Sequence, residues 1–458
     1  MPSIRAVLLS ANRQTAIVIS TVCASLILGG GGGATPLVDM ALECLMALLI
    51  GVWFVDPTRR PLASRLPWVI VALVLLLPIL QLVPLPPSIW TRLPGRGIEV
   101  EALQLIGQAH SWRPWSMVPA MTLSALLAMA VNVMLVPMVA SLDHVGRIKV
   151  LLVIVGTAVL SLVVGAAQIT GGAGAAFRFY DQFGQYLHGF QGNRGRAADH
   201  LLIAIVCTGL VTRYFVQTGA ISGRASTVTA VNAAATLVLA LGVVLTGSRM
   251  GMALIPIAII AQFLLVRPYV AGSLRVSWLM GIGATAGGLA LAVLLSGSPI
   301  IGRALARFSS GGEMRPEIWT DSLYVAQLYQ PWGSGFGTFV PIFNISERLE
   351  AVSNFYINHA HCDFLELYLE GGVPALVILG LIACLLLGGA VAGLRAQSPV
   401  VRANVIAGFG GLAILAGHSL TEYPLRALSH ACLAAVMAAF ILAREPRALV
   451  SGKGKVSV

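Results

Sequence analysis

The chain has 458 residues, of which 57% are hydrophobic and only 10% are charged, and its mean hydropathy is +0.87. One water-soluble core cannot bury so much apolar surface, so a soluble globular protein is excluded. The net charge of +11 would suggest nucleic-acid binding in a soluble protein. Here the arginines recur between apolar runs, and that pattern indicates membrane topology with no nucleic-acid partner.

Apolar runs of about 17–25 residues match the hydrocarbon thickness of a bilayer and recur about twelve times along the chain. They predict an all-α polytopic membrane protein. The first run follows Arg5 and Arg13, as in a signal peptide, but no small-residue cleavage site stands out near GGGGGA at 29–34, so we expect a retained helix. The expected spans are 14–31, 36–55, 66–84, 116–140, 149–170, 197–212, 227–247, 250–266, 276–296, 373–393, 403–420 and 427–443.

Basic residues collect in alternate connections, as the positive-inside rule requires of the cytoplasmic side. These connections and the tail contain Arg59, Arg60, Arg65, Arg147, Lys149, Arg213, Arg224, Arg267, Arg275, Arg395, Arg402, Arg444, Arg447, Lys453 and Lys455. Both termini are therefore expected inside. Three regions follow: spans one to nine with short loops (1–296), a large outer loop (297–372), and spans ten to twelve with a cytoplasmic tail (373–458).

The outer side contains twelve arginines and no lysine. Solvation explains any single arginine, but the bias favours phosphate recognition, because a guanidinium holds phosphate oxygens bidentately and stays charged near a membrane. Arg249, in LTGSRMGM, lies at the outer end of a span with almost no loop after it. A charge at that depth is by default functional, the alternative being a side chain that reaches lipid headgroups.

The stretch NHAHCDFLELYLEGGVP, residues 358–374, concentrates ionisable groups in this apolar chain. On a helix, His359, Asp363, Glu366 and Glu370 would form one stripe, and His361 would lie about half a turn away. A break is expected at Gly371-Gly372 before Pro374. A histidine beside phosphate-binding arginines fits a general base for a hydroxyl, whereas an isolated histidine is ordinarily a capping or packing residue.

A metal site is a further interpretation of this stretch, because His359, His361 and Asp363 read as H-x-H-x-D. It is disfavoured, since the sheet scaffold that usually carries such a motif is absent and the outer loops offer only His110 and His188 besides. Five of the six cysteines fall inside apolar spans and only Cys362 lies in an outer connection, so we expect no disulfides.

Four segments resemble the O-antigen ligase and polysaccharide polymerase family. In HAHCDFLELYLEGGVPAL, His361 precedes Gly372 by eleven residues, as in the family signature. The other segments are GFQGNRGRAADHLL at 189–202, TGSRMGM at 246–252 and RPEIWTDSLYVAQLYQPWGSGFGTF at 315–339, in the family's order. The sequence departs from the pattern where Cys362 replaces the usual Asn and where Gly195-Arg196 replace what is often Asn-His.

The resemblance implies a GT-C-like fold and a metal-independent, inverting glycosyl transfer, without cofactor, at the periplasmic face of the bacterial inner membrane. The donor would be a glycan on undecaprenyl diphosphate. By this analogy His361 assists the acceptor hydroxyl and Arg249 holds the diphosphate. The expected substrate-binding residues, by resemblance, position and charge, are Arg315, Arg194, Arg196, His359, Asp363 and Glu366.

The acceptor stays open at this stage. A polymerase would add the growing chain to a new lipid-linked repeat unit, and the HAH variant and the acidic stripe favour this reading on resemblance. A ligase would use lipid A core instead, and a chain-length regulator is a possible further partner. A transporter or flippase of lipid-linked sugars is the third alternative, supported by Asp39 and Glu43 within one span, although no duplicated pattern relates the two halves.

Overall fold

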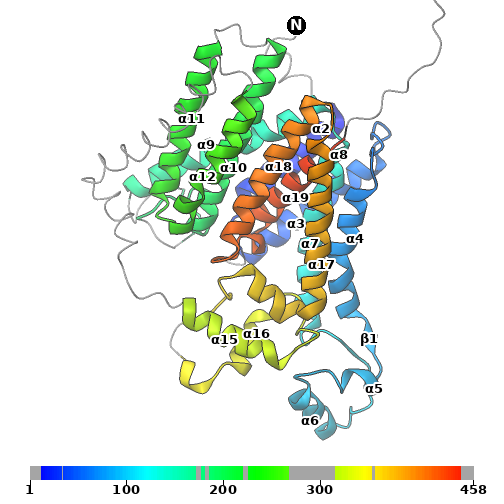
Figure 1. Ribbon diagram of the computed structural model, residues 1–458. Coiled ribbons are helices and arrows are strands. Elements are labelled where there is room, and N and C mark those ends of the chain that lie inside the picture. Colours follow the sequence, from blue (N-terminus) through cyan, green and yellow to red (C-terminus); the bar gives the residue numbers. More distant parts are fainter. Residues whose placement is uncertain are drawn as a thin grey trace, which may run out of the picture.

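The computed structural model describes residues 12–32, 35–171, 177–180, 185–219, 225–267, 315–352 and 356–444, with no side-chain description for 225–229. The expected all-α membrane architecture is confirmed: within these ranges seven helices are long and apolar enough to cross a membrane, and four shorter apolar helices accompany them (Figure 1). The expected span at 276–296 lies outside the described residues.

The helices agree closely with the remaining expected spans. The long ones are α3 (Pro36–Val55), α7 with α8 (Pro119–Val133 and Leu135–Ser141), α9 (His144–Gly171), α10 (Arg194–Thr218), α12 (Arg249–Val266), α17 (Asp363–Leu394) and α18 (Pro399–His418). The shorter ones are α2 (Arg13–Leu28), α4 (Leu66–Leu82), α11 (Ala225–Leu245, counted here as Ala230–Leu245, where its side chains are described) and α19 (Leu428–Leu442).

Local caps determine where the helices begin. Asn193 precedes α10 and its side-chain oxygen accepts a hydrogen bond from the backbone N–H of Gly195 at 2.6 Å. Ser248 caps α12 in the same way, accepting from Gly251 at 3.1 Å. Because a cap satisfies a backbone donor that has no partner within the helix, both helices start next to a polar loop residue.

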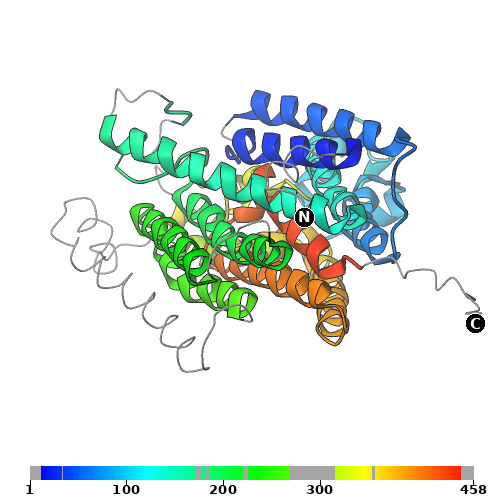
Figure 2. The same ribbon diagram turned by 90° about the horizontal axis from the view of Figure 1, so that it is seen from above.

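Helix α10 is the buried centre of the bundle. Its side chains from Gly195 to Leu210 are all buried, and it contacts α9, α11, α12 and α18. Figure 2 shows α2 and α3 (blue) and α11 and α12 (green) on opposite sides of the bundle, with α19 (red) between them. Outward-facing apolar side chains such as Leu48, Val163 and Val377 are more than half exposed, as expected of surfaces that face lipid.

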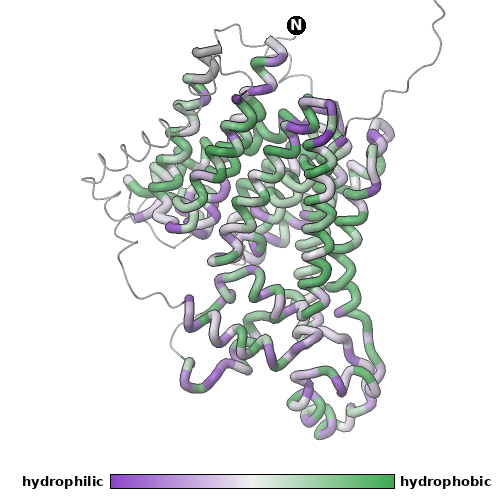
Figure 3. Tube along the Cα trace, in the orientation of Figure 1, coloured by the Kyte–Doolittle hydropathy of each residue, from purple (hydrophilic) through white to green (hydrophobic). Residues whose placement is uncertain are grey.

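A polar layer covers one end of the bundle, the lower end in Figure 1 and the most hydrophilic part of Figure 3. It includes a two-stranded antiparallel ribbon in which Pro84 pairs with Pro114. The elements of this layer are β1 (Pro84–Leu85), α5 (Pro87–Trp90), α6 (Gly97–Leu105), β2 (Arg113–Pro114), α15 (Arg315–Leu328), α16 (Phe339–Ser346), η4 (Leu349–Ala351) and η5 (Pro424–Arg426).

The expected helix break at Gly371-Gly372 is present as a kink inside α17. Gly372 has φ 60° and ψ −157°, and the helix continues on both sides of it. The segment after α15 packs into this kink, where the backbone N–H of Val373 donates to the carbonyl of Pro331 at 2.9 Å and that of Gly335 to the carbonyl of Glu370 at 2.8 Å. The polar layer is thereby attached to a membrane helix.

Replacing Gly372 with alanine should destabilise the protein. A Cβ at this position would lie 2.2 Å from the carbonyl oxygen of Pro331, and the positive φ disfavours any side chain. We expect the G372A variant to lose more than about 1 kcal/mol of stability, seen as a lower thermal unfolding midpoint in detergent. Gly380, in the same helix, has open space around it and provides the control, G380A. Equal midpoints for the two variants would contradict the assignment of strain to Gly372.

Candidate functional site

Most of the residues selected from the sequence gather at the end of the bundle that the polar layer covers. Helices α10, α12, α15 and α17 all begin there, and the loop at 419–427 joins α18 to α19 at the same end (Figure 1). Residues from four separate stretches of sequence are thus brought to one place.

A small cavity lies between these helix starts, with room for little more than one water molecule, about 20 Å³. Its lining includes Arg194 at the start of α10, Arg249 at the start of α12 and Arg315 at the start of α15. The complete lining is Arg194, Gly195, Gly247, Ser248, Arg249, Met250, Arg315, His418, Thr421 and Glu422. Helix N-termini carry partial positive charge and free backbone N–H groups, so together with three arginines they favour an anionic group.

Glu422 connects this cavity to the histidine motif. One carboxylate oxygen forms an ion pair with Arg315, and the other lies 3.3 Å from Nδ1 of His361. Burial by itself would raise the pKa of Glu422, but the hydrogen bond with His361 and the positive charge of Arg315 outweigh burial, so its pKa is lowered. The carboxylate is therefore charged at neutral pH and holds the imidazole beside the arginines.

His361 has an unusual backbone conformation for a residue with a side chain. Its φ is +50°, in the left-handed region, and its carbonyl oxygen accepts a hydrogen bond from the indole N–H of Trp319 at 3.3 Å. The imidazole meets the ring of Tyr423 edge to face, with centroids 5.1 Å apart, and the side chain stays 26% exposed. Such conformations cost free energy and concentrate at functional sites. His361 is thus held firmly and remains accessible.

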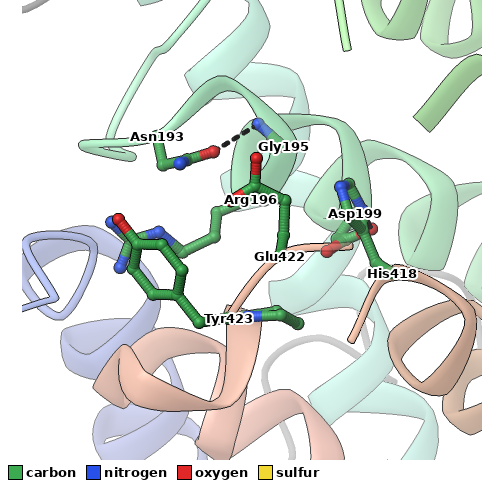
Figure 4. Close-up of a pocket in the computed structure, with 8 residues that line it drawn as sticks. Asn193, Gly195, Arg196, Asp199, His418, Glu422 and Tyr423 are labelled. Atoms are coloured by element: carbon green, nitrogen blue, oxygen red, sulfur yellow. Dashed lines mark hydrogen bonds and ion pairs between the residues drawn. The ribbon is translucent and has the colours of Figure 1, made fainter. Parts of the chain in front are cut away.

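A second, narrower cavity, with no room for a water molecule, adjoins the first (Figure 4). Arg196 and Tyr423 lie side by side in its wall, with the guanidinium carbon 5.8 Å from the ring centroid. Gly195, His418 and Glu422 line both cavities. Arg196, which the sequence predicts as a substrate-binding residue, therefore lines the second cavity and not the one that contains the three arginines.

The acidic stripe turns inward, toward Arg426. The guanidinium lies 2.7 Å from Glu370, 3.3 Å from Glu366 and 3.9 Å from Asp363. Burial by itself would lower the pKa of Arg426, but these three carboxylates raise it well above its usual value. The four charges join the start of α17 to the turn at η5.

His359 also belongs to this cluster. Its Nδ1 lies 2.9 Å from Glu366, and its ring stacks on that of Tyr423 at 4.1 Å between centroids. The expected helical stripe is wrong in one respect: the helix begins at Asp363, so His359 reaches Glu366 from the extended segment before it. Asp363 accepts a hydrogen bond from the hydroxyl of Ser419 at 2.8 Å.

The structure thus divides the selected residues into two groups. Arg249, Arg194 and Arg315 line one cavity, and His361 contacts Glu422 in the wall of that cavity. By contrast, His359, Asp363 and Glu366 are engaged in the Arg426 cluster. Binding of substrate by members of either group stays a prediction.

Sequence reasoning did not select Glu422, Tyr423, His418 or Arg426 for the site. All four lie at or next to the short turn between the last two spans, which reads TEYPLR at 421–426. Two opposite charges in a six-residue turn between apolar helices were the available signal. The partners of those charges lie tens of residues away along the chain, so the turn alone does not indicate them.

The H-x-H-x-D motif does not bring its three side chains together. His359 meets Glu366, His361 meets Glu422, and Asp363 meets Ser419 and Arg426. Among the residues that the structure describes, no group of three or more His, Cys, Asp or Glu side chains could hold a metal ion. All six cysteines are free thiols in the structure.

Comparison with known proteins agrees with the family resemblance. A family model described as O-antigen ligase matches residues 234–380. This range includes α12, the described part of the large connection and the first half of α17, and therefore Arg249, Arg315 and His361. The match supports O-antigen ligase or polymerase activity in general. No curated protein matches the chain.

Removing the Arg426 charge should destabilise the fold. The R426M variant would leave three largely buried carboxylates without their shared cation, and a loss of one partner of a buried ion pair costs about 3–5 kcal/mol. We expect a large drop in thermal unfolding midpoint and in the yield of monodisperse protein. The matched control is R402M, because Arg402 is exposed and its guanidinium donates to the carbonyl of Ala396 in the same short connection. If both variants unfold at the wild-type temperature, the cluster does not hold the site together.

Proposed function

We propose that the chain polymerises lipid-linked oligosaccharide repeat units, because a family model described as O-antigen ligase matches residues 234–380. The donor in this proposal is a glycan on undecaprenyl diphosphate, and the acceptor is a hydroxyl of another lipid-linked repeat unit. The product is exopolysaccharide or O-antigen. Transfer takes place at the periplasmic face of the inner membrane, with inversion at the anomeric carbon and with both termini cytoplasmic.

One observation carries this proposal: Glu422 lies between His361 and a cavity lined by three arginines. A group transfer of this kind needs a base for the acceptor hydroxyl and positive charge for the departing diphosphate. The His361–Glu422 pair and the cavity supply these two requirements side by side.

The arginine-lined cavity is the proposed diphosphate site. The cavity has room for little more than one water molecule, about 20 Å³, so the side chains around it must move apart to admit a diphosphate. In this proposal the sugars lie toward the polar layer and the lipid chain lies toward the bilayer. Arg249 is the proposed principal contact, and Arg194 and Arg315 add further charge.

His361 is the proposed base because of the partner that it has on the other nitrogen. In this proposal the Nδ1–H of His361 donates a hydrogen bond to the carboxylate of Glu422. The lone pair of Nε2 is then left to accept the proton of the acceptor hydroxyl. The charged carboxylate also stabilises the imidazolium that forms when the hydroxyl proton is taken. Glu422 thus acts through His361, as a positioning residue.

The other selected residues have supporting roles in this proposal. Arg196 lines the adjoining cavity and would contact the donor there. His359, Asp363 and Glu366 would act indirectly, since their contacts hold the segment before α17 against the turn with Glu422 and Tyr423. Since the arginines supply the positive charge, we propose that transfer needs no metal ion.

Reconstitution of the purified protein distinguishes the candidate functions. Liposomes would contain the protein and a lipid-linked repeat unit, in EDTA, with or without lipid A core. Polymer formed without lipid A core supports the polymerase, and a conjugate formed only with lipid A core identifies a ligase. Movement of the donor across the bilayer without a new glycosidic bond would point to a transporter and overturn the proposal.

His361→Ala should abolish glycan transfer while the protein still inserts and folds. Loss of a general base typically costs a factor of about 10²–10⁴ in rate. The measurement is the initial rate of polymer or conjugate formation in liposomes. His110, which is exposed in the outer connection after α6, provides the control H110A. Transfer by the H361A variant at the wild-type rate would rule out the catalytic role.

Arg249→Lys should weaken donor use although the positive charge is kept. An ammonium group cannot reproduce the two parallel hydrogen bonds of a guanidinium to a phosphate. We expect the KM for the donor to rise by roughly tenfold, the effect of losing one charge-assisted hydrogen bond. Arg92→Lys, at an exposed arginine on the same side, is the matched control. An unchanged KM in R249K would count against the diphosphate clamp.

A further inference from the structure

A second histidine–carboxylate pair lies behind the arginine-lined cavity. Nδ1 of His418, the last residue of α18, is 2.6 Å from Oδ1 of Asp199 in the second turn of α10. The two side chains are 1% and 0% exposed. The proposed function has no use for this pair, and its atoms belong to two helices that the sequence separates by more than two hundred residues.

The other ring nitrogen of His418, Nε2, lies on the side of the ring away from Asp199. Among the described residues, Nε2 has no hydrogen-bond partner, and neither has Oδ2 of Asp199. His418 lines both cavities. A Cβ at Gly195 would lie 2.8 Å from Nε2, so any larger residue there would cover this nitrogen.

A packing role does not account for this arrangement. Leaving a buried polar atom without a partner costs about 1–3 kcal/mol, so a histidine that merely fills space would be expected to use both nitrogens. His430, buried at the start of α19, does use both, with Ser429 and with the carbonyl of Arg196. Within the described part of the chain, Nδ1 of His200 and Nδ1 of His144 also lack a partner, but neither of those residues lines the two cavities, whereas His418 lines both. The position of the free nitrogen of His418 therefore points to a ligand.

The charges around the cavity indicate that this ligand is an anion. Nδ1 faces the carboxylate of Asp199, and Nε2 faces a space that Arg194, Arg249 and Arg315 prepare for an anion. Only the imidazolium form presents an N–H to both of them. A lone pair on Nε2 would repel the same anion.

We propose that the Asp199–His418 pair is a proton donor to the departing diphosphate, an inference that rests on the proposed function. His418 is the catalytic residue in this proposal, and Asp199 is a positioning residue that stabilises the imidazolium. The pair complements His361, which takes a proton where His418 gives one.

The step balances without a cofactor. The acceptor oxygen forms a bond to the anomeric carbon, and its proton passes to Nε2 of His361. The bond from the anomeric carbon to the diphosphate oxygen breaks, its electron pair stays on that oxygen, and the oxygen takes the proton from Nε2 of His418. Exchange with water then returns His361 to its neutral form and His418 to its charged form.

Several charged or titratable groups surround His418. They are Asp199 and Arg196 from α10, Glu422 from the loop after α18, Arg315 from α15, Arg249 from α12, and His430 from α19. Asp199 and Glu422 favour the imidazolium, and the arginines oppose it. Replacement of Asp199 removes the favourable charge that is in direct contact.

The pH dependence of transfer tests the pair. With His361 as base and His418 as acid, the rate should rise and then fall with increasing pH. In H418Q the falling limb should disappear and the maximal rate should drop by about 10²–10⁴-fold. In D199N, which keeps the shape of the side chain, the falling limb should move to lower pH while the rising limb stays in place. The control is H200Q, because His200 is equally buried in α10 but lines neither cavity.

A profile of unchanged shape in both H418Q and D199N, with the protein folded, would overturn the proposal. Binding of methylenediphosphonate to the detergent-solubilised protein separates this failure from failure of the proposed function. If the wild-type protein takes up a proton when methylenediphosphonate binds, and H418Q does not, the result supports the pair even if no glycan is transferred. Binding with the same proton uptake in H418Q counts against it, whatever the transfer assay shows.

Discussion

The shared ion pairing of Arg426 with Asp363, Glu366 and Glu370 is the constraint on which the site depends. These contacts attach the turn after α18 to the first two turns of α17. The backbone strengthens the attachment, because the N–H of Asp363 lies within hydrogen-bonding distance of the carbonyls of both Ser419 and Glu422. Glu422 and the segment that holds His361 therefore take up fixed positions relative to each other.

This arrangement explains why an apolar chain concentrates charge in one short segment. The carboxylates of α17 are internal and neutralise Arg426, whereas the arginines at the starts of α10, α12 and α15 line a cavity. Charged side chains in this polar layer thus have two roles. The inner charges stabilise the geometry, and in the proposed function the outer ones meet the donor.

Much of this organisation could be predicted from local sequence. Spans follow from hydropathy, and the kink in α17 follows from two glycines before Pro374, since Gly372 alone tolerates its positive φ. The helix starts at Arg194 and Arg249 follow from polar capping residues. These features depend on neighbours in sequence, and a single chain displays them.

The contacts between distant segments could not be predicted in the same way. His361 meets Glu422 across 61 residues, and His418 meets Asp199 across 219. The backbone of His361 also departs from any regular pattern, because its φ of +50° lies in the left-handed region. Periodicity identified an ionisable stripe, but only the packing of α17 against the last turn shows that this stripe faces Arg426.

The most direct measurement is an experimental structure of the protein with a donor analogue in which methylenediphosphonate replaces the diphosphate. The account predicts phosphonate density between Arg194, Arg249 and Arg315, with the first sugar close to His361. Density at the opposite end of the bundle, near Arg147 and Arg213, would contradict the central claim that one cavity brings the guanidinium of Arg249 and the imidazole of His361 to the same substrate.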